Sequence, residues 1–371
     1  MRVLVTGGAG FIGSHLVDAL FERGHEVRVL DALVTQVHSG GRPPGYLSEA
    51  AELRTGDLRD TEAVGEAVEG CEAVFHLASA VGVGQSMYAV REYVEANVVG
   101  TAVLLEEIVA RRDAVRKVVV ASSMSNYGEG LYRAADGTFL APRPRGRAQL
   151  EGRRWELEGE DGAPLEPLPT DEDKPLAPTS VYATTKRDQE ELVLNVCGAY
   201  GIPAVALRYF NVYGTRQSLS NPYTGVAAIF AARILNDEPP LVFEDGQQSR
   251  DFIHVRDVVR ANICALHGHE ADGSVVNVGT GRPTSLLELC ALLLSELDKP
   301  ELEPVVTERF REGDIRHCYA DIGLARRLLG FEPSVSPHDG ISDLADWARD
   351  QPATDLVDAA VGELRRHALL R

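Results

Sequence analysis

The chain has 371 residues, 44% of them hydrophobic, and a formal net charge of −19 at pH 7. Its length and apolar content predict a globular protein with a large core, built as one large domain or two closely associated ones. The strong negative charge argues against nucleic acids and anionic membranes as partners, and it means that a phosphate-bearing ligand needs arginines gathered around it.

The cysteines and the hydropathy pattern favour a cytoplasmic location. The five cysteines are scattered and form no CxxC pair, which is typical of reduced thiols rather than of a disulfide framework. No apolar run approaches 18 residues, so no membrane span is expected. The first residues enter a strand-like run at once, without the pattern of a secretory signal.

Strand-like and helical segments alternate in the first part of the chain. Strands are expected at residues 3–6, 26–30, 53–55, 73–77 and 118–121, and helices at 14–23, 61–69 and 90–111. Thr61 is the expected cap of its helix. The continuous apolar run at 118–121 is typical of a parallel strand that is buried on both faces. The alternation predicts an α/β fold with a doubly wound parallel sheet and right-handed crossovers.

Residues 129–178 interrupt this alternation. The segment is rich in Pro, Gly, Arg and Glu and lacks periodicity. It is too long for an ordinary loop and is therefore functional, separately folded or mobile. The alternation returns with a helix at 180–200 and a strand at 204–209, and further helices are expected near 286–297, 322–329 and 354–370.

A glycine-rich loop joins the first expected strand to the first helix. Gly7 permits a tight turn, Gly10 lets the backbone approach a pyrophosphate, and Gly13 allows close packing of helix on strand. The free N–H groups of the helix N-terminus favour phosphate. Because the loop has a strand before it and a helix after it, the pattern indicates a dinucleotide site.

Two aspartates follow the next expected strands. Asp31 lies eighteen residues after Gly13, where a carboxylate would bond both ribose hydroxyls and repel a 2′-phosphate, so NAD is favoured over NADP. Asp57 is a candidate for the adenine edge, and capping of the following helix is the alternative.

Tyr182 and Lys186 are four residues apart and would share one face of the helix at 180–200. A tyrosine with its reference pKa of about 10 is a poor base, but a nearby ammonium group and a positive nicotinamide ring favour the phenolate. Ser123 follows the buried strand at 118–121, at the strand end that faces a ligand crevice in a parallel sheet. These three residues are the candidate catalytic group.

Several motifs, spread along nearly the whole chain, occur in the order in which a known family has them. They are Gly7–Gly13, Gly56-Asp57, His76-Leu77-Ala78, Asn97, Ser122-Ser123, Tyr182 with Lys186, Arg208-Tyr209-Phe210-Asn211 and Arg250-Asp251-Phe252. In these motifs the chain resembles the extended short-chain dehydrogenase/reductase family, and within it the NAD-dependent nucleotide-sugar epimerases and dehydratases. The resemblance implies a Rossmann sheet with a smaller C-terminal α+β substrate domain.

The resemblance also implies domain bounds. We expect an NAD-binding domain at 1–210, with the insertion at about 129–178 and a return at about 242–280, a substrate-binding domain at 211–241 and 281–350, and a C-terminal helix at 351–371.

The resemblance also implies roles for individual residues. Besides the catalytic Ser123, Tyr182 and Lys186, the resemblance assigns NAD to Gly7, Gly10, Phe11, Ile12, Gly13, Asp31, Asp57, Leu58, Leu77, Ala78, Ser79, Asn97, Ala121, Tyr182, Lys186 and Tyr209. It assigns the nucleotide-diphosphate sugar to Val83, Ser123, Met124, Ser125, Asn211, Arg216, Val226, Arg250 and Arg311. The guanidinium groups of these arginines would bind the diphosphate despite the negative net charge of the protein.

The reaction depends on the residues after Ser123. Family 4,6-dehydratases carry Thr-Asp-Glu where this chain has Ser123-Met124-Ser125, decarboxylases keep a glutamate at the Ser125 position, and 3,5-epimerases use a cysteine there. Met124 cannot exchange protons and Ser125 is a poor substitute. What remains is removal and return of a hydride through a transient 4-keto sugar. The chain is therefore expected to be a 4-epimerase, an isomerase, acting on a dTDP- or UDP-linked (6-deoxy)hexose.

Two alternatives remain open for the activity. A 4-ketoreductase or dehydrogenase would share the catalytic residues but exchange its NAD(P) with solvent, and a non-catalytic NAD-binding protein could share the fold. The finer resemblance is to the dTDP-L-rhamnose 4-epimerase and UDP-glucose 4-epimerase type, with Asn126 as a departure because valine is usual there.

The insertion and the assembly carry two further expectations. Relatives have paired cysteines in the insertion, suggestive of zinc, but this chain has none there, so no metal is expected. The insertion forms either a lid or wall over the sugar or a surface decoration. A homodimer is expected, paired through the helices at 90–111 and 180–200.

Overall fold

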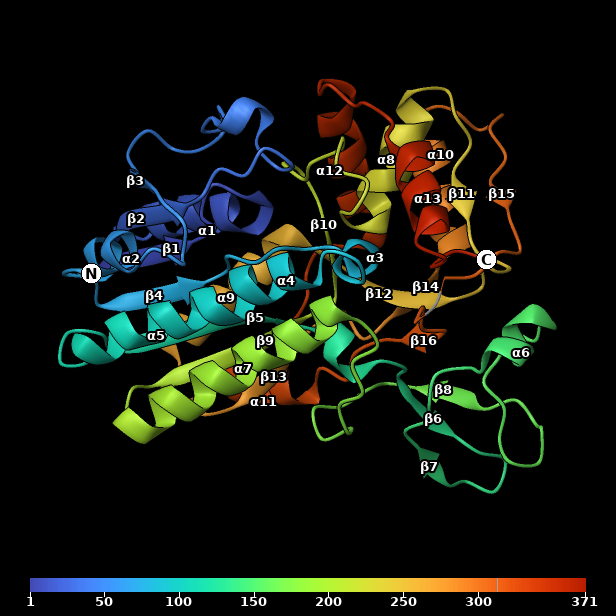
Figure 1. Ribbon diagram of the computed structural model, residues 1–371, viewed down its shortest axis with the longest axis horizontal. Helices are drawn as coiled ribbons and strands as arrows, with labels where there is room; N and C mark the ends of the chain where they lie inside the picture. The colour runs from blue at the N-terminus through green and yellow to red at the C-terminus, as the bar shows by residue number, and fades with distance from the viewer. Residues whose placement is uncertain (312) are drawn as a thin grey trace.

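The computed structural model describes residues 1–311 and 313–371. Within these residues a seven-stranded parallel sheet forms the centre of the molecule, in the order β13-β9-β5-β4-β1-β2-β3 (Figure 1). Its strands are β1 (Arg2–Thr6), β2 (Glu26–Asp31), β3 (Glu52–Thr55), β4 (Ala73–His76), β5 (Lys117–Ser123), β9 (Ala204–Tyr209) and β13 (Val275–Val278). This arrangement confirms the α/β class and the Rossmann sheet.

The sheet is buried on both faces because its strands are apolar at successive positions. In β5, Val119 belongs to one core cluster and Val120 to another, and both are fully buried. Helices cover the two faces (Figure 1). One face carries α1 (Phe11–Glu22), α9 (Val255–His267) and α11 (Gly323–Leu329), and the other carries α2 (Thr61–Val68), α5 (Gly100–Ala110) and α7 (Val181–Tyr200).

Three local details differ from the expectation. The cap of α2 is Asp60 and not Thr61, because the Asp60 carboxylate accepts hydrogen bonds from the backbone N–H groups of Glu62 and Ala63. Ser123 is the last residue of β5 rather than the residue after a strand. The expected helix at 90–111 is three joined segments, α4 (Val90–Tyr93), a π-helical stretch at Val94–Val99, and α5.

Much of the chain from Asn211 onward builds a second layer of structure beside the carboxyl ends of the sheet. A small sheet contains β10 (Asn211–Tyr213), β12 (Ser249–His254), β14 (Pro283–Ser285) and β16 (His317–Cys318). A separate apolar cluster joins α8 (Val226–Leu235), α10 (Leu286–Glu296) and α12 (Pro337–Arg349). Between β12 and α10 the chain returns to the central sheet as β13. The domain bounds derived above stay a prediction.

The C-terminal helix is shorter than expected, α13 (Val357–Arg366) in place of 354–370. In the part of the chain that the structure describes, no helix combines the length and the apolar character needed to cross a membrane.

The insertion folds into a small unit of its own at the lower right of Figure 1. Its elements are β6 (Leu131–Arg133), β7 (Phe139–Leu140), α6 (Arg147–Glu151) and β8 (Glu166–Leu168), with β6 paired antiparallel to both other strands. Tyr132, Leu157 and Leu165 form its buried cluster. Of the three readings of this segment, the structure therefore shows a separately folded one.

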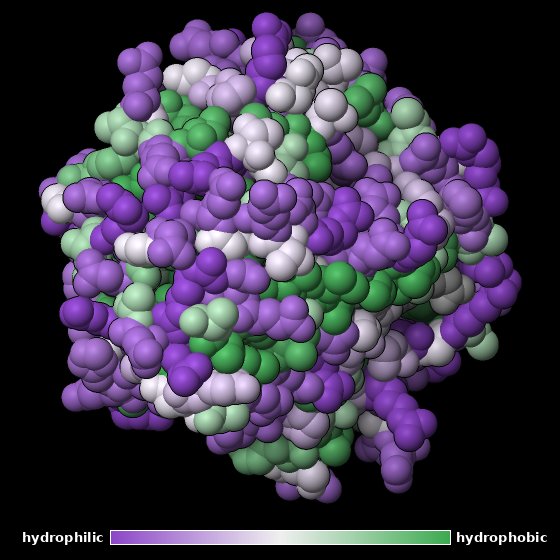
Figure 2. All heavy atoms as spheres, turned by 60° about the vertical axis from the view of Figure 1, so that its left-hand side comes forward, coloured by the Kyte–Doolittle hydropathy of each residue, from purple (hydrophilic) through white to green (hydrophobic). Residues whose placement is uncertain are grey.

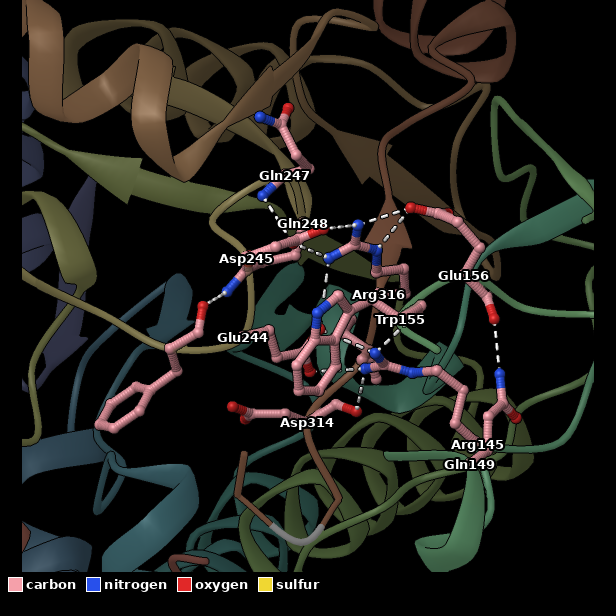
Figure 3. A network of polar contacts seen from close by, with 12 residues as sticks. Arg145, Gln149, Trp155, Glu156, Glu244, Asp245, Gln247, Gln248, Asp314 and Arg316 are labelled. Atoms are coloured by element: carbon pink, nitrogen blue, oxygen red, sulfur yellow. Dashed lines mark hydrogen bonds and ion pairs between the residues drawn. The ribbon is translucent and has the colours of Figure 1, made fainter. Parts of the chain in front are cut away.

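Buried ion pairs attach the insertion to the second layer (Figure 3). Arg145 of the insertion donates two hydrogen bonds to Glu244, of 2.7 and 2.9 Å, and both side chains are buried. Arg316 binds Asp245 at 2.6 Å and Glu156 of the insertion at 2.5 Å. Each buried guanidinium thus has a carboxylate from across the junction, which offsets its desolvation.

We expect Glu244→Ala to lower the free energy of unfolding by about 3–5 kcal/mol, because it removes the carboxylate that accepts two hydrogen bonds from the buried Arg145 guanidinium. The exposed pair of Arg133 with Glu166, at 2.7 Å, is the control. Glu166→Ala should cost less than about 1 kcal/mol. Urea unfolding of both variants measures the difference, and equal losses would contradict the importance of the buried pair.

Candidate functional site

The carboxyl ends of β1 and β4 meet at the point where the strand order reverses. Gly7 has a φ of +69°, and a Cβ there would lie 2.9 Å from the Ala78 backbone. A Cβ at Gly13 would lie 2.2 Å from the Gly7 carbonyl oxygen. Gly10 precedes α1 without a side-chain cap, so the N–H groups of the first turn, which contains Phe11 and Ile12, are left for a ligand. This geometry fits a pyrophosphate.

Asp31 ends β2 beside this loop. Its carboxylate accepts hydrogen bonds from the N–H groups of Ala9 (3.0 Å) and Leu33 (2.9 Å), which fix its orientation and leave acceptor capacity for ribose hydroxyls. The Nε2 of His38 lies 3.7 Å from the carboxylate. A 2′-phosphate at this position would meet the negative charge of Asp31.

Asp57 is held by its neighbour rather than by a helix end. Arg59 donates to it through its backbone and its guanidinium, and these bonds lower the pKa of the Asp57 carboxyl group. Capping of α2 falls to Asp60. Contact of Asp57 with adenine stays a prediction. Leu58 is buried beneath Gly100, where a Cβ would lie 2.9 Å away.

Two side chains that close over the glycine loop come from outside it. The Tyr46 hydroxyl donates to the Ala9 carbonyl oxygen (3.4 Å), and the Arg216 guanidinium lies 5.3 Å from the Tyr46 ring centre. Arg216 also pairs with Asp18 of α1 at 2.8 Å. Tyr46 has no motif around it, so the sequence offered no signal for it. Arg216 lies on the dinucleotide side, and its contact with substrate stays a prediction.

The candidate catalytic residues come together where β5 ends and α7 begins. The half-buried Tyr182 phenol has its pKa raised by burial and lowered to a smaller extent by a hydrogen bond with Ser123. Ser123 also accepts from the Ser125 hydroxyl (2.8 Å) and backbone N–H (3.2 Å). Ser180 caps α7, and the Tyr182 backbone N–H donates to Ser86, so the start of the helix is fixed.

Lys186 is buried one turn further along α7. Burial lowers the pKa of its amino group to about 7, and the Glu190 charge opposes that shift. The amino group donates to the Gln189 side-chain oxygen at 2.7 Å. Gln189 carried no motif in the sequence.

Asn97 joins the segment after β4 to α7. Its side chain bonds both backbone groups of Ala80, at 2.7 and 3.1 Å, and the Thr185 hydroxyl at 2.9 Å. It sits in the π-helical stretch, so its bonds to Ala80 and to α7 follow from an irregular turn that periodicity could not predict. Contact of Asn97 with NAD stays a prediction.

The buried carboxylate next to this group is fully engaged. Glu190 receives two hydrogen bonds from Arg208, of 2.6 and 2.9 Å, and one from the Ser122 hydroxyl at 2.6 Å. Because those donors saturate it, Glu190 is not available to exchange protons with a ligand at Ser123.

The candidate substrate residues differ in burial and in their partners. The Asn211 side-chain oxygen is buried without a partner, which fits a ligand contact. Met124 is buried, Val226 begins α8, and Val83 is exposed.

The candidate arginines are held by other parts of the protein. Arg250 donates to three backbone carbonyl groups, those of Ser249, Ile315 and Arg316. Arg311 pairs with Asp314 at 2.8 Å and covers the Phe243 ring. Binding of the diphosphate by Arg250 and Arg311 stays a prediction.

The C-terminal segment pairs with the loop that contains Arg311, a contact that the sequence did not indicate. Phe310 and Arg371 exchange two backbone hydrogen bonds of 3.0 Å, beside Arg311. In α13, Glu363 accepts hydrogen bonds from the hydroxyls of Tyr88 and Tyr223. The chain end therefore connects the loop that contains Arg311 with the loop around Val83.

The side chains that commonly bind metal ions are His, Cys, Asp and Glu. Over residues 1–311 and 313–371 no group of three or more His, Cys, Asp and Glu side chains could hold an ion. The cysteine thiols are free, and Cys71, Cys197, Cys290 and Cys318 are buried.

Comparisons with known proteins agree with this geometry. Residues 3–150 and 156–279 match the model of the NAD dependent epimerase/dehydratase family. The dTDP-L-rhamnose 4-epimerase of Burkholderia thailandensis is 37% identical over 348 residues, 93% of this chain and 94% of that protein. A putative UDP-glucose 4-epimerase of Methanocaldococcus jannaschii is 33% identical over 95% of this chain and 100% of its own length. The crystal structure of Thermotoga maritima UDP-glucose 4-epimerase with UDP-glucose superposes with a TM-score of 0.76 at 33% identity, covering 94% of this chain and 99% of that chain. These findings confirm the resemblance inferred from the motifs.

We expect Asp31→Asn to weaken NAD binding about 10- to 100-fold, because hydrogen bonds to a charged group contribute about 1.5–3 kcal/mol. The amide keeps the size of the side chain and removes its charge, so the affinity for NADP should rise relative to that for NAD. Calorimetric titration of NAD-free protein with both dinucleotides measures the two effects. An unchanged NAD affinity would show that Asp31 does not bind the ribose.

Proposed function

The chain belongs to the NAD dependent epimerase/dehydratase family, and on this premise we propose that it is a nucleotide-sugar 4-epimerase, an isomerase that uses bound NAD. One observation carries the proposal: Ser123 and Tyr182 meet at the carboxyl end of β5, with Met124 and Ser125 beside them instead of an acidic pair. Relatives named as 4-epimerases cover nearly the whole chain.

The glycine loop and Asp31 fit NAD. Gly7, Gly10 and Gly13 leave room for a pyrophosphate at the start of α1, and the Asp31 carboxylate is placed for the adenosine ribose. When bound, NAD supplies the acceptor for the hydride of the sugar carbinol and the donor for its return.

Proton transfer falls to Tyr182. As a phenolate it would take the proton of the sugar 4-hydroxyl, while the Ser123 hydroxyl holds the same oxygen. Burial alone raises the pKa of the Tyr182 phenol, so the phenolate needs a positive charge nearby. Lys186, on the same helix face, supplies it. On the return step Tyr182 gives the proton back, and the C4 configuration is inverted.

The surroundings of Ser123 disfavour loss of water or carbon dioxide from the keto sugar. Met124 has no proton to exchange, and the Ser125 hydroxyl is bound to Ser123. Glu190 is saturated by Arg208 and Ser122. The ketone therefore has hydride return as its outlet.

The substrate is proposed to be a dTDP- or UDP-linked hexose, as the names of the relatives suggest. Asn211, Arg216, Arg250 and Arg311 would gather positive and polar groups around its diphosphate, in a protein whose net charge is −19. The reduced, scattered cysteines support a cytoplasmic location, without nucleic acid or membrane partners.

The assembly is proposed to be a homodimer through the helices α4 to α5 and α7. Figure 2 shows apolar surface gathered on one face of the molecule among polar residues. Val90, Val94 and Val99 are 46%, 38% and 45% exposed, which is costly for a free helix surface and suits a partner helix. A light-scattering mass equal to that of one chain would contradict the dimer.

The test of the function is incubation of the purified protein, without added cofactor, with separate UDP-, dTDP- and GDP-sugars. Inversion at C4, followed by NMR, supports the epimerase. Activity that appears only with added NAD(P)H and gives net reduction would instead identify a 4-ketoreductase.

We expect Tyr182→Phe to lower kcat about 10³-fold, because it removes the general base and acid. NAD should remain bound, and the melting temperature should change little because the ring is kept. Turnover within a few-fold of the wild type would contradict the assigned role.

A further inference from the structure

The ammonium group of Lys186 has a fixed partner that the proposed mechanism does not use. Gln189, one turn along α7, accepts its hydrogen bond at 2.7 Å, and both side chains are almost completely buried. Residues three apart on a helix share a face, so this contact is built into α7. An ammonium group has donors only, and the Gln189 oxygen must therefore point at Lys186.

The NH2 group of the Gln189 amide is held by residues of α5 and β4. Its NH2 group donates to the Thr101 hydroxyl of α5 at 2.9 Å and lies 3.1 Å from Nε2 of His76, the last residue of β4. Thr101 in turn donates to the Asn97 carbonyl oxygen. The amide cannot turn over without losing these bonds, so its oxygen stays directed at Lys186.

His76 continues the chain of hydrogen bonds to the glycine loop. Its Nδ1 lies 2.9 Å from the hydroxyl of Thr6, the residue before Gly7. Burial first, and the Lys186 charge second, lower the pKa of His76 to about 3. His76 is therefore neutral, so Lys186 is the member of this network that can carry a positive charge.

The charges around Lys186 can be named element by element. On α7 it faces Glu190, which is paired with Arg208 of β9. On β4 it faces the neutral His76. Tyr93 of α4 interacts electrostatically with Tyr182, and burial raises the pKa of the Tyr93 phenol well above neutrality, so it remains uncharged. Gln189 is the neutral acceptor placed directly on the ammonium group.

We propose that Gln189 is a positioning residue for Lys186: its oxygen, oriented by Thr101 and His76, holds the buried ammonium group in its charged form on the Tyr182 face of α7. The inference rests on the proposed function, in which Lys186 supports the Tyr182 phenolate. Burial disfavours the charged form of the lysine, and a hydrogen-bond acceptor directed at the ammonium group favours it. The same bonds connect the lysine to Thr6 and so to the loop that would bind the pyrophosphate.

Gln189→Leu and Gln189→Glu should shift the titration midpoint of Lys186 in opposite directions. Leucine removes the acceptor, so the Lys186 titration midpoint should fall by about 1 pH unit or more. Glutamate keeps the shape and adds a negative charge, so the midpoint should rise. Above its midpoint the amine is neutral and no longer favours the phenolate, and the alkaline limb of the kcat profile should shift in the same direction as the midpoint in each variant.

Two readouts separate the inference from the function. The lysines of the chain are Lys117, Lys174, Lys186 and Lys299, so ¹³C-labelled lysine gives an NMR spectrum simple enough to titrate, with Lys186→Arg assigning the signal. The kcat profile on the sugar found by the panel is the second readout. Midpoints that do not move in either variant overturn the inference even if the protein is an epimerase. Midpoints that move as stated, without C4 inversion of any sugar, uphold the contact and overturn the function.

Gln248→Leu provides the matched control. Gln248 is a buried amide of the same residue type, just before β12, whose NH2 group donates to the Phe243 carbonyl oxygen at 3.0 Å. Its loss should lower the melting temperature while the Lys186 midpoint and the kcat profile stay in place. If this control moves the midpoint as far as Gln189→Leu does, the effect is one of general destabilisation and the inference is wrong.

Discussion

The close approach of the β1 and β4 carboxyl ends is the constraint on which the rest of the structure depends. Gly7 must be a glycine because a Cβ there would lie 2.9 Å from the Ala78 backbone. From this contact the hydrogen bonds of Thr6, His76 and Gln189 lead to Lys186 on α7, and the neighbouring strand, β5, ends in Ser123. A sheet buried on both faces holds these ends in register, so the candidate reacting groups do not depend on flexible loops.

Buried charge is handled in the same way at two places. Arg208 and Glu190 pair behind the Ser123 strand end, and Arg145 and Glu244 pair where the insertion meets the second layer. In each case the carboxylate is saturated by donors from another part of the chain, so it fixes geometry and does not act as a proton carrier. The first pair bears on chemistry, because a free carboxylate at that place would give the keto sugar a second outlet.

The C-terminal segment is tied to two loops that contain candidate substrate residues, Arg311 and Val83. Arg311, Glu363 and the terminal Arg371 belong to one connected surface through backbone pairing and tyrosine hydroxyls. The arginines are oriented by carbonyl groups and carboxylates of the protein itself. These bonds fix the orientation of the guanidinium groups in a protein whose net charge is −19.

The sequence by itself determined the Rossmann sheet, the glycine loop, and the group of Ser123, Tyr182 and Lys186, because these rest on local patterns: apolar periodicity, glycine spacing and a four-residue helical interval. It did not determine the contacts of Gln189 and Tyr46 or the pairing of the C-terminal segment with Phe310, and it placed the α2 cap one residue late. Those features are contacts between residues far apart in the chain, such as Gln189 with His76 and Phe310 with Arg371. Only packing of the tertiary structure decides them, since no local spacing records which distant side chain will satisfy a buried polar atom.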